Sequence, residues 1–161
     1  MIDKIIPLHS MFYLNTKLLT NSLEGVNKEL YLKMPDAQLN SIAFLACHCL
    51  DARFYMAGMA GLQLTNPYKE IFDKIIRPDQ FDEFPSIEEV IKLWKEMSKT
   101  VEEKMIIITD DELNKESPIQ LPLVEKTVLG SITFFLQHEA YHIGQIALLR
   151  KLHGLPAMKY V

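Results

Sequence analysis

The sequence has only two cysteines, Cys47 and Cys49, among its 161 residues. Two residues apart on a helix, their side chains would point about 200° apart around the axis, so they cannot form a disulfide with each other. The chain also shows no basic segment followed by an apolar segment and a small-residue cleavage site, so we expect no secretory signal. Unpaired cysteines without a signal predict a cytoplasmic protein whose cysteines fill the core.

Clustered basic residues are also missing. Lysine and arginine total 17 against 21 acidic residues, which gives a net charge of −4. No Lys/Arg cluster interleaved with aromatics occurs that could follow a phosphate backbone, so nucleic acid is excluded as an expected partner. The longest apolar stretch, SIAFLACHCLDARFYMAGMAGL, is interrupted in its middle by His48, Asp51 and Arg53. We therefore expect a buried helix and no membrane contact.

Sheet signals are absent as well, because no segment alternates apolar and polar residues for long and no Asn-Gly turn occurs. Four long segments carry helical periodicity instead. They run from about Pro7 to Glu24, from Asn40 or Ser41 to about Gly61, from Ser86 to about residue 105, and from about residue 127 to His153. The connections are long enough to run back along a helix, so we predict one domain, residues 1–161, that forms an all-α four-helix bundle with long crossover connections.

Local patterns refine this prediction. The first helix is expected to bury Met11, Leu14 and Leu18. Ser86 begins the S-x-x-E pattern of a capping box at the start of the third helix. In the two longer connections, YKEIFDKI and DDELN are each expected to form a short helical segment.

The segment HEAYH, residues 138–142, contains the most informative spacing in the chain. On a helix, His138 and His142 would project within about 40° of each other, one turn apart. Phe135 and Leu149 follow the same face, which makes it a buried side. A buried polar group without a partner costs about 1 to 3 kcal/mol, so the two imidazoles must either hydrogen-bond to another helix or bind a metal.

A third histidine favours the metal. His48 is central in the apolar second helix, and three imidazoles suit zinc, nickel or iron. H-E-x-x-H is also a zinc-protease signature, but the metzincin extension needs glycine at position 145 and histidine at position 148, where this chain has Gln145 and Leu148. No glutamate follows Glu139 to serve as a third ligand in the other common protease plan. We therefore predict a different site, with His48, His138 and His142 as the ligands.

Two polar residues beside the histidine pair are weak candidates for a catalytic role. Glu139 lies about 100° from His138 around the helix. A surface or bundle-seam carboxylate is favoured over a general base acting on a metal-bound water. Gln145, one turn after His142, is expected to lie beside the open coordination positions and bind a water or ligand, or else to hydrogen-bond to another helix.

Two further residues have open roles. Asp51, one turn after His48, has two possible roles. Its carboxylate could accept a hydrogen bond that orients a ligand histidine, or it could be solvated, which is slightly favoured. His9 is expected to be solvated or hydrogen-bonded away from the site.

Two segments resemble the signature segments of the DinB/YfiT-like metal-binding four-helix proteins: LNSIAFLACHCLDARFYMAG and SITFFLQHEAYHIGQIALLRKLHGLP. DDELN resembles the segment that usually precedes the last helix in this family. The second segment is the more specific, because its histidine pair, Gly144, Gln145 and its leucine-rich exit to Gly154 fall where the family's pattern places them. Ile143 stands where the family usually has an arginine.

The resemblance implies a fold, a site and a chemistry. It implies that His48, His138 and His142 are metal ligands, and that the bundle assembles as a homodimer. It also implies a small-molecule substrate and a transferase that uses a low-molecular-weight thiol. Three neutral histidines leave coordination positions open, so hydrolysis by a metal-bound water is an alternative. A non-catalytic metal-binding bundle is the other.

Overall fold

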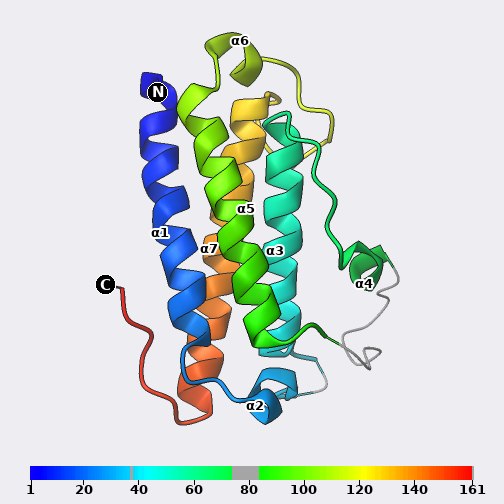
Figure 1. Ribbon diagram of the computed structural model, residues 1–161, viewed down its shortest axis with the longest axis vertical. Coiled ribbons are helices and arrows are strands. Elements are labelled where there is room, and N and C mark those ends of the chain that lie inside the picture. The colour runs from blue at the N-terminus through cyan, green and yellow to red at the C-terminus, as the bar shows by residue number, and fades with distance from the viewer. Residues whose placement is uncertain (37, 74–83, 161) are drawn as a thin grey trace.

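The computed structural model describes residues 1–36, 38–73 and 84–160. Within these ranges the regular structure is helical, with one isolated bridge between Glu116 and Thr127. Four long helices form a bundle (Figure 1): α1 (Ile6–Leu23), α3 (Ile42–Met59), α5 (Ile87–Ile107) and α7 (Val128–Leu152). The short elements are the 3-10 turn Asp3–Ile5 and helices α2 (Lys28–Leu32), α4 (Lys69–Asp73) and α6 (Asp110–Leu113). The predicted all-α class is confirmed.

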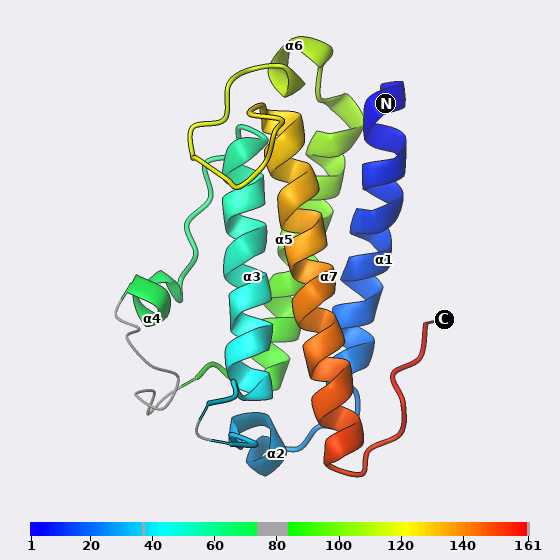
Figure 2. The ribbon, with the colours of Figure 1, turned by 180° about the vertical axis from the view of Figure 1, so that it is seen from behind.

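The four long helices form a square in which α7 and α5 each pack against both α1 and α3. The remaining two pairs of long helices, α1 with α3 and α5 with α7, therefore lie diagonally across the bundle. Figures 1 and 2 show that α3 and α5 run in the same direction, opposite to α1 and α7. The chain must return along the length of the bundle between α3 and α5, which is the expected crossover. None of the described helices is long and apolar enough to cross a bilayer.

Side chains fix where most helices begin. The capping box predicted at Ser86 is present, since Ser86 Oγ accepts from the Glu89 backbone and the Glu89 carboxylate accepts from the Ser86 N–H. Ser41, rather than Asn40, caps α3. Helix α6 coincides with the predicted DDELN segment, and α4 lies inside YKEIFDKI, whose last two residues fall outside the described ranges. Helix α2, capped by Asn27, was not predicted, because five residues are too few to show a periodicity.

The predicted buried face of α1 was partly wrong. Met11 and Leu14 are 41% and 40% exposed, and only Leu18 of the three is buried. The face that enters the core instead contains Phe12 and the amide of Asn15. Asn15 is buried because its Nδ2 donates to the Leu136 carbonyl and to the Glu139 carboxylate, two acceptors that the α1 sequence alone does not reveal.

A salt bridge lies at the centre of the bundle. Arg53 of α3 donates from Nε and Nη2 to the two carboxylate oxygens of Glu139 on α7, over 2.8 and 2.6 Å, and both side chains are 0% exposed. The guanidinium lies between the rings of Phe12 and Trp94, 4.2 and 3.5 Å from their centroids. Planar stacking of this kind suits arginine and not lysine.

Helices α1 and α5 complete the hydrogen bonds of this pair. Arg53 Nη1 donates to Thr16 Oγ1 on α1 and to Ser98 Oγ on α5, over 2.7 and 2.6 Å. Asn15 Nδ2 on α1 donates to Glu139 Oε2 over 3.3 Å. All four long helices therefore contribute a partner to a single buried ion pair, and its stability depends on their relative positions.

Removing one partner should destabilise the fold strongly. We expect Arg53→Met to lower the free energy of unfolding by about 3 to 5 kcal/mol, because it leaves the Glu139 charge buried and unpaired. The double variant Arg53→Met/Glu139→Leu should recover most of this loss. Urea denaturation of the wild type, both single variants and the double variant measures the coupling between the two residues.

A matched control is Lys104→Met, which breaks the partly exposed pair between Lys104 and Glu112. Its expected cost is below about 1 kcal/mol, since solvent screens such pairs. An Arg53→Met variant no less stable than Lys104→Met would contradict the central role of the buried pair.

Candidate metal centre

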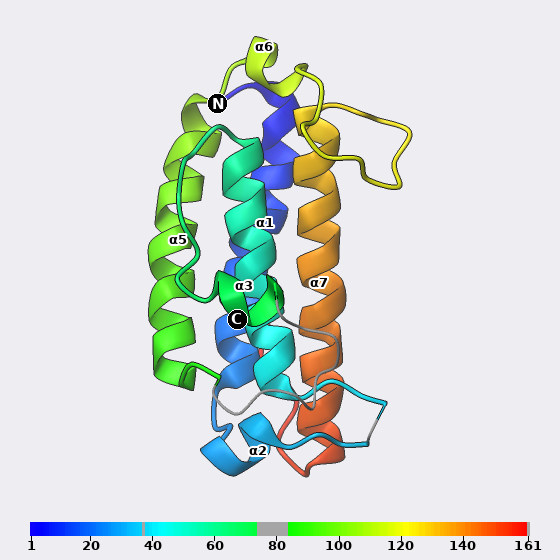
Figure 3. The same cartoon turned by 90° about the vertical axis from the view of Figure 1, so that its right-hand side faces the viewer.

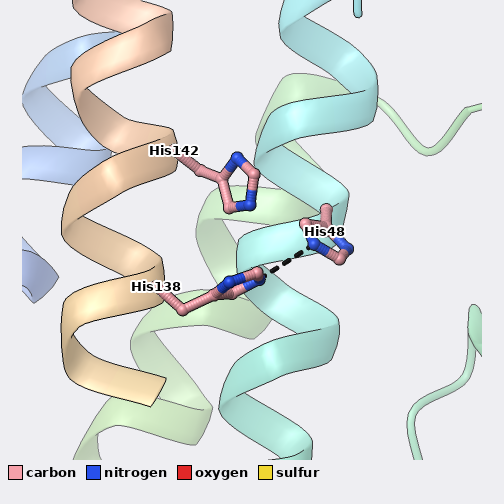
Figure 4. Close-up of side chains that lie close together, drawn as sticks. All are labelled: His48, His138 and His142. Carbon is pink, nitrogen blue, oxygen red and sulfur yellow. Dashed lines mark hydrogen bonds between the residues drawn. The ribbon is translucent and has the colours of Figure 1, made fainter. Parts of the chain in front are cut away.

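The structure brings the three predicted histidines together. Helices α3 and α7 lie side by side (Figure 3). His48 lies on α3, and His138 and His142 lie one turn apart on the facing side of α7 (Figure 4). One nitrogen from each ring lies within 4.8 Å of the others. Nε2 of His48 and Nε2 of His138 are 2.9 Å apart. The three ring centroids are separated by 4.4 to 4.9 Å.

Four aromatic side chains surround these imidazoles, and we call them the aromatic collar: Phe44, Phe72, Phe134 and Tyr141. Phe44 stacks on His48 with a centroid distance of 5.7 Å. Phe134 stacks on His138 in the same way at 5.8 Å. The collar removes water from the rings, and low exposure favours whichever protonation state carries no charge.

The environment keeps all three histidines neutral. Burial, with smaller contributions from His142 and His138, lowers the pKa of His48 from 6.5 to about 4. Burial also lowers the pKa of His138, with His142 adding to the effect. Burial lowers the pKa of His142 too, although the hydrogen bond that His142 donates to Gln145 acts in the opposite direction. Neutral imidazoles offer the lone pairs that a metal ion requires.

Gln145 orients one of the three rings. Its Oε1 lies 2.6 Å from Nδ1 of His142, and its Nε2 donates to the Tyr141 hydroxyl over 3.3 Å. Because an amide oxygen can only accept, Nδ1 of His142 carries the proton and Nε2 keeps its lone pair for a ligand. Both hydrogen bonds of Gln145 stay within α7, which differs from the alternative prediction of a hydrogen bond to another helix. Gln145 is only partly exposed and does not point outward into solvent.

Glu139 points away from the histidine cluster. Its carboxylate is bound by Arg53 and Asn15 in the core, so the bundle-seam position is the correct one of the alternatives considered. Sequence reasoning missed Arg53 as its partner. The signal was a lone arginine in an apolar helix, which requires a buried acid somewhere else in the chain.

Asp51 and His9 each have a hydrogen-bond partner outside the histidine cluster. The favoured prediction that Asp51 is solvated is wrong, since it is 9% exposed and accepts from Asn66 Nδ2 over 2.7 Å. His9 lies 3.0 Å from the Glu102 carboxylate, as a hydrogen-bonded histidine away from the site should. Cys47 and Cys49 are buried core residues, and burial raises the pKa of the Cys47 thiol to about 12.

The donor set fits a divalent metal ion. Two nitrogens held by one tetrahedral ion at about 2.1 Å would be roughly 3.4 Å apart. The separation of 2.9 Å between His48 Nε2 and His138 Nε2 and the upper bound of 4.8 Å for the whole set bracket that value. Among the described residues, no carboxylate or thiolate joins this group, so the donors are three neutral nitrogens.

The lowered pKa values predict how the protein responds to acid once a chelator has removed any metal. In the unfolded chain His48 has its ordinary pKa of 6.5, whereas in the folded protein its pKa is about 4. The unfolding free energy should therefore fall as the pH drops from about 6.5 to about 4. NMR titration of the His48 imidazole measures this pKa, with the same titration in urea as the control. A folded-state value at or above the one in urea would contradict the described environment.

Comparisons with known proteins agree with this fold. A family model described as the DinB superfamily matches residues 11–146. No curated protein matches the chain. The crystal structure of the DinB-like protein YjoA of Bacillus subtilis is similar, with a TM-score of 0.65 and 18% identity, over 96% of this chain and 97% of that one. At this identity the crystal structure supports the shared fold, and the family match extends over most of the chain. The chain therefore belongs to the DinB superfamily.

Proposed function

We propose that the protein is a divalent-metal-dependent S-transferase that joins a low-molecular-weight thiol to a small electrophile. His48, His138 and His142 are its metal ligands. The observation that carries the proposal is the cluster of neutral imidazoles at the wall of an open hollow of about 250 Å³, which reaches His48 and His138. A purely structural metal site would be closed on all sides, whereas a catalytic one keeps a position that a substrate can reach.

When bound, a zinc, nickel or iron ion would act as a Lewis acid that lowers the pKa of a thiol into the neutral range. The protein's own residues hold and shield this site. Gln145 fixes the Nδ1 proton of His142 and so directs Nε2 toward the cluster. The aromatic collar limits water around the rings. With three neutral ligands, the positive charge is not compensated by the protein, which favours binding of an anionic thiolate.

The thiol has to come from solution. The chain's own thiols, Cys47 and Cys49, are 1% and 0% exposed. Burial raises the pKa of both, so they stay protonated and unreactive near neutral pH. A separate small thiol is therefore a second substrate in this proposal.

Hydrolysis is the less favoured reaction. In H-E-x-x-H enzymes the glutamate serves as the general base. Here that residue, Glu139, is fully buried and accepts two hydrogen bonds from Arg53. A hydrolase on this scaffold would lack the carboxylate base of those enzymes and would depend on the metal alone to deprotonate its water.

Removing one ligand should abolish metal binding and turnover without unfolding the bundle. We expect His142→Ala to lose the metal and its activity toward a chromogenic aryl halide with a small thiol, because two imidazoles hold a divalent ion far more weakly than three. Metal content after dialysis, circular dichroism and product formation are the measurements. His9→Ala is the control, because His9 pairs with Glu102 outside the cluster and should leave all three unchanged.

The thiol requirement separates the alternatives. Product formation should need both the metal and the added thiol. Turnover of an ester or amide without thiol would identify a hydrolase instead. A fully loaded protein that is inactive across broad panels would identify a non-catalytic metal-binding bundle.

Gln145 should tune the metal affinity through His142. We expect Gln145→Leu to weaken metal binding by about 10- to 100-fold, because His142 loses the acceptor that fixes its orientation. Competition titration with a chromogenic chelator measures the change. Tyr141→Phe is the matched control, since it removes only the outer bond between Gln145 and the Tyr141 hydroxyl. Equal affinities for Gln145→Leu and Tyr141→Phe would show that the amide does not act on the ligand.

A further inference from the structure

We propose that the hollow beside His48 and His138 binds the uncharged apolar part of the electrophile, with the size of a single ring. We call it the apolar hollow. This inference rests on the proposed function for its meaning, but the binding itself depends only on the protein's side chains. The reacting end of the electrophile would then lie beside the imidazole cluster, within reach of the thiolate, and its carbon skeleton would lie in the apolar hollow.

Three segments build the walls of the apolar hollow. Ala52 and Tyr55 come from α3, Phe134 and Phe135 from α7, and Ile119 from the loop between α6 and α7. The rings of Tyr55 and Phe135 lie almost parallel, with an interplanar angle of 12° and a centroid distance of 6.2 Å. Flat aromatic walls favour a flat apolar guest.

The volume selects the size of that guest. The apolar hollow has about 250 Å³. An apolar protein cavity of roughly 150 Å³ is enough to bind benzene. The apolar hollow therefore has room for one ring with small substituents beside the imidazoles.

Charge is unfavourable in this hollow. Apart from the imidazoles, the described polar groups of its lining are the Tyr55 hydroxyl, which carries no charge, and the Asp51 carboxylate, which already accepts from Asn66. No described lysine or arginine lines the hollow to pair with an anionic group. A charged group buried without a partner would strongly oppose binding, so the part of the substrate held here is uncharged.

A second hollow of about 200 Å³ lies beyond the other end of the cluster. Helices α3 and α7 are antiparallel, so residues before His48 face residues after His142 (Figure 3). Its lining combines five leucines with the amides of Gln38, Asn40 and Gln145, which the apolar hollow lacks. Amide groups suit a polar peptide-like thiol, which leaves the apolar hollow to the electrophile.

The transfer step is balanced with this placement. The thiol loses its proton to solvent, and its sulfur forms a bond to the electrophilic carbon of the guest in the apolar hollow. The leaving group, such as a halide, departs with the electron pair of its broken bond to carbon. No oxidant or reductant is required.

Binding of fluorobenzene, followed by ¹⁹F NMR line broadening, tests the inference in chelator-treated protein. Fluorobenzene should bind, and 4-fluorobenzoate, of similar shape but charged, should bind at least about tenfold more weakly. Two variants should each weaken fluorobenzene binding by about tenfold or more: Ala52→Leu, which fills the hollow, and Ile119→Lys, which places a charge at its wall. Leu148→Lys is the matched control, because it adds the same charge at the second hollow and should leave binding unchanged.

The outcomes separate this inference from the proposed function. Equal binding of fluorobenzene to the wild type and to both hollow variants would overturn it, as would equal binding of the benzoate. Zinc affinity of the folded variants should match the wild type, because neither residue belongs to the histidine cluster. If fluorobenzene binds as expected but no thiol transfer is found, the proposed function fails while the apolar binding site stands.

Discussion

Arg53 and Glu139 form a fully buried ion pair whose hydrogen bonds involve all four long helices. Taking two charges out of water is costly, and the cost is offset only when each donor and acceptor finds a partner in good geometry. Thr16, Ser98 and Asn15 provide those partners from α1 and α5. A slide of one helix past another would leave a buried charge partly unsatisfied, so the pair sets the register of the whole bundle.

The same pair also aligns the candidate metal centre. Glu139 follows His138 directly on α7, and Arg53 lies on the helix that carries His48. Holding Glu139 against Arg53 on the core side of α7 therefore fixes the height at which His138 and His142 face His48 across the groove. Within H-E-x-x-H, the two histidines share one side of the helix, and the glutamate points about 100° away from His138. In zinc proteases this motif forms the catalytic site. Here its two histidines belong to the candidate metal centre, and its glutamate belongs to the ion pair in the core.

Several potentially reactive side chains of α3 and α7 are buried in the core and do not reach the histidine cluster. The glutamate of the motif and both cysteines are buried and held away from the histidines, so the reacting groups in our proposal come from the metal and the two substrates. What the protein contributes is neutral nitrogen donors, an aromatic collar and two hollows of different polarity. Association into a homodimer stays a prediction of the family resemblance.

By itself the sequence determined the four long helices and the pairing of His138 with His142, because helical periodicity and an i, i+4 spacing are local properties of the chain. The capping box at Ser86 is local in the same sense. Only the tertiary structure decided which face of α1 is buried, that Asp51 is bound by Asn66, and that Glu139 belongs to Arg53, which is 86 residues away in the sequence. These choices depend on where a distant partner lies after packing. No local pattern encodes that position, because side-chain burial is decided by what the other helices place opposite each face.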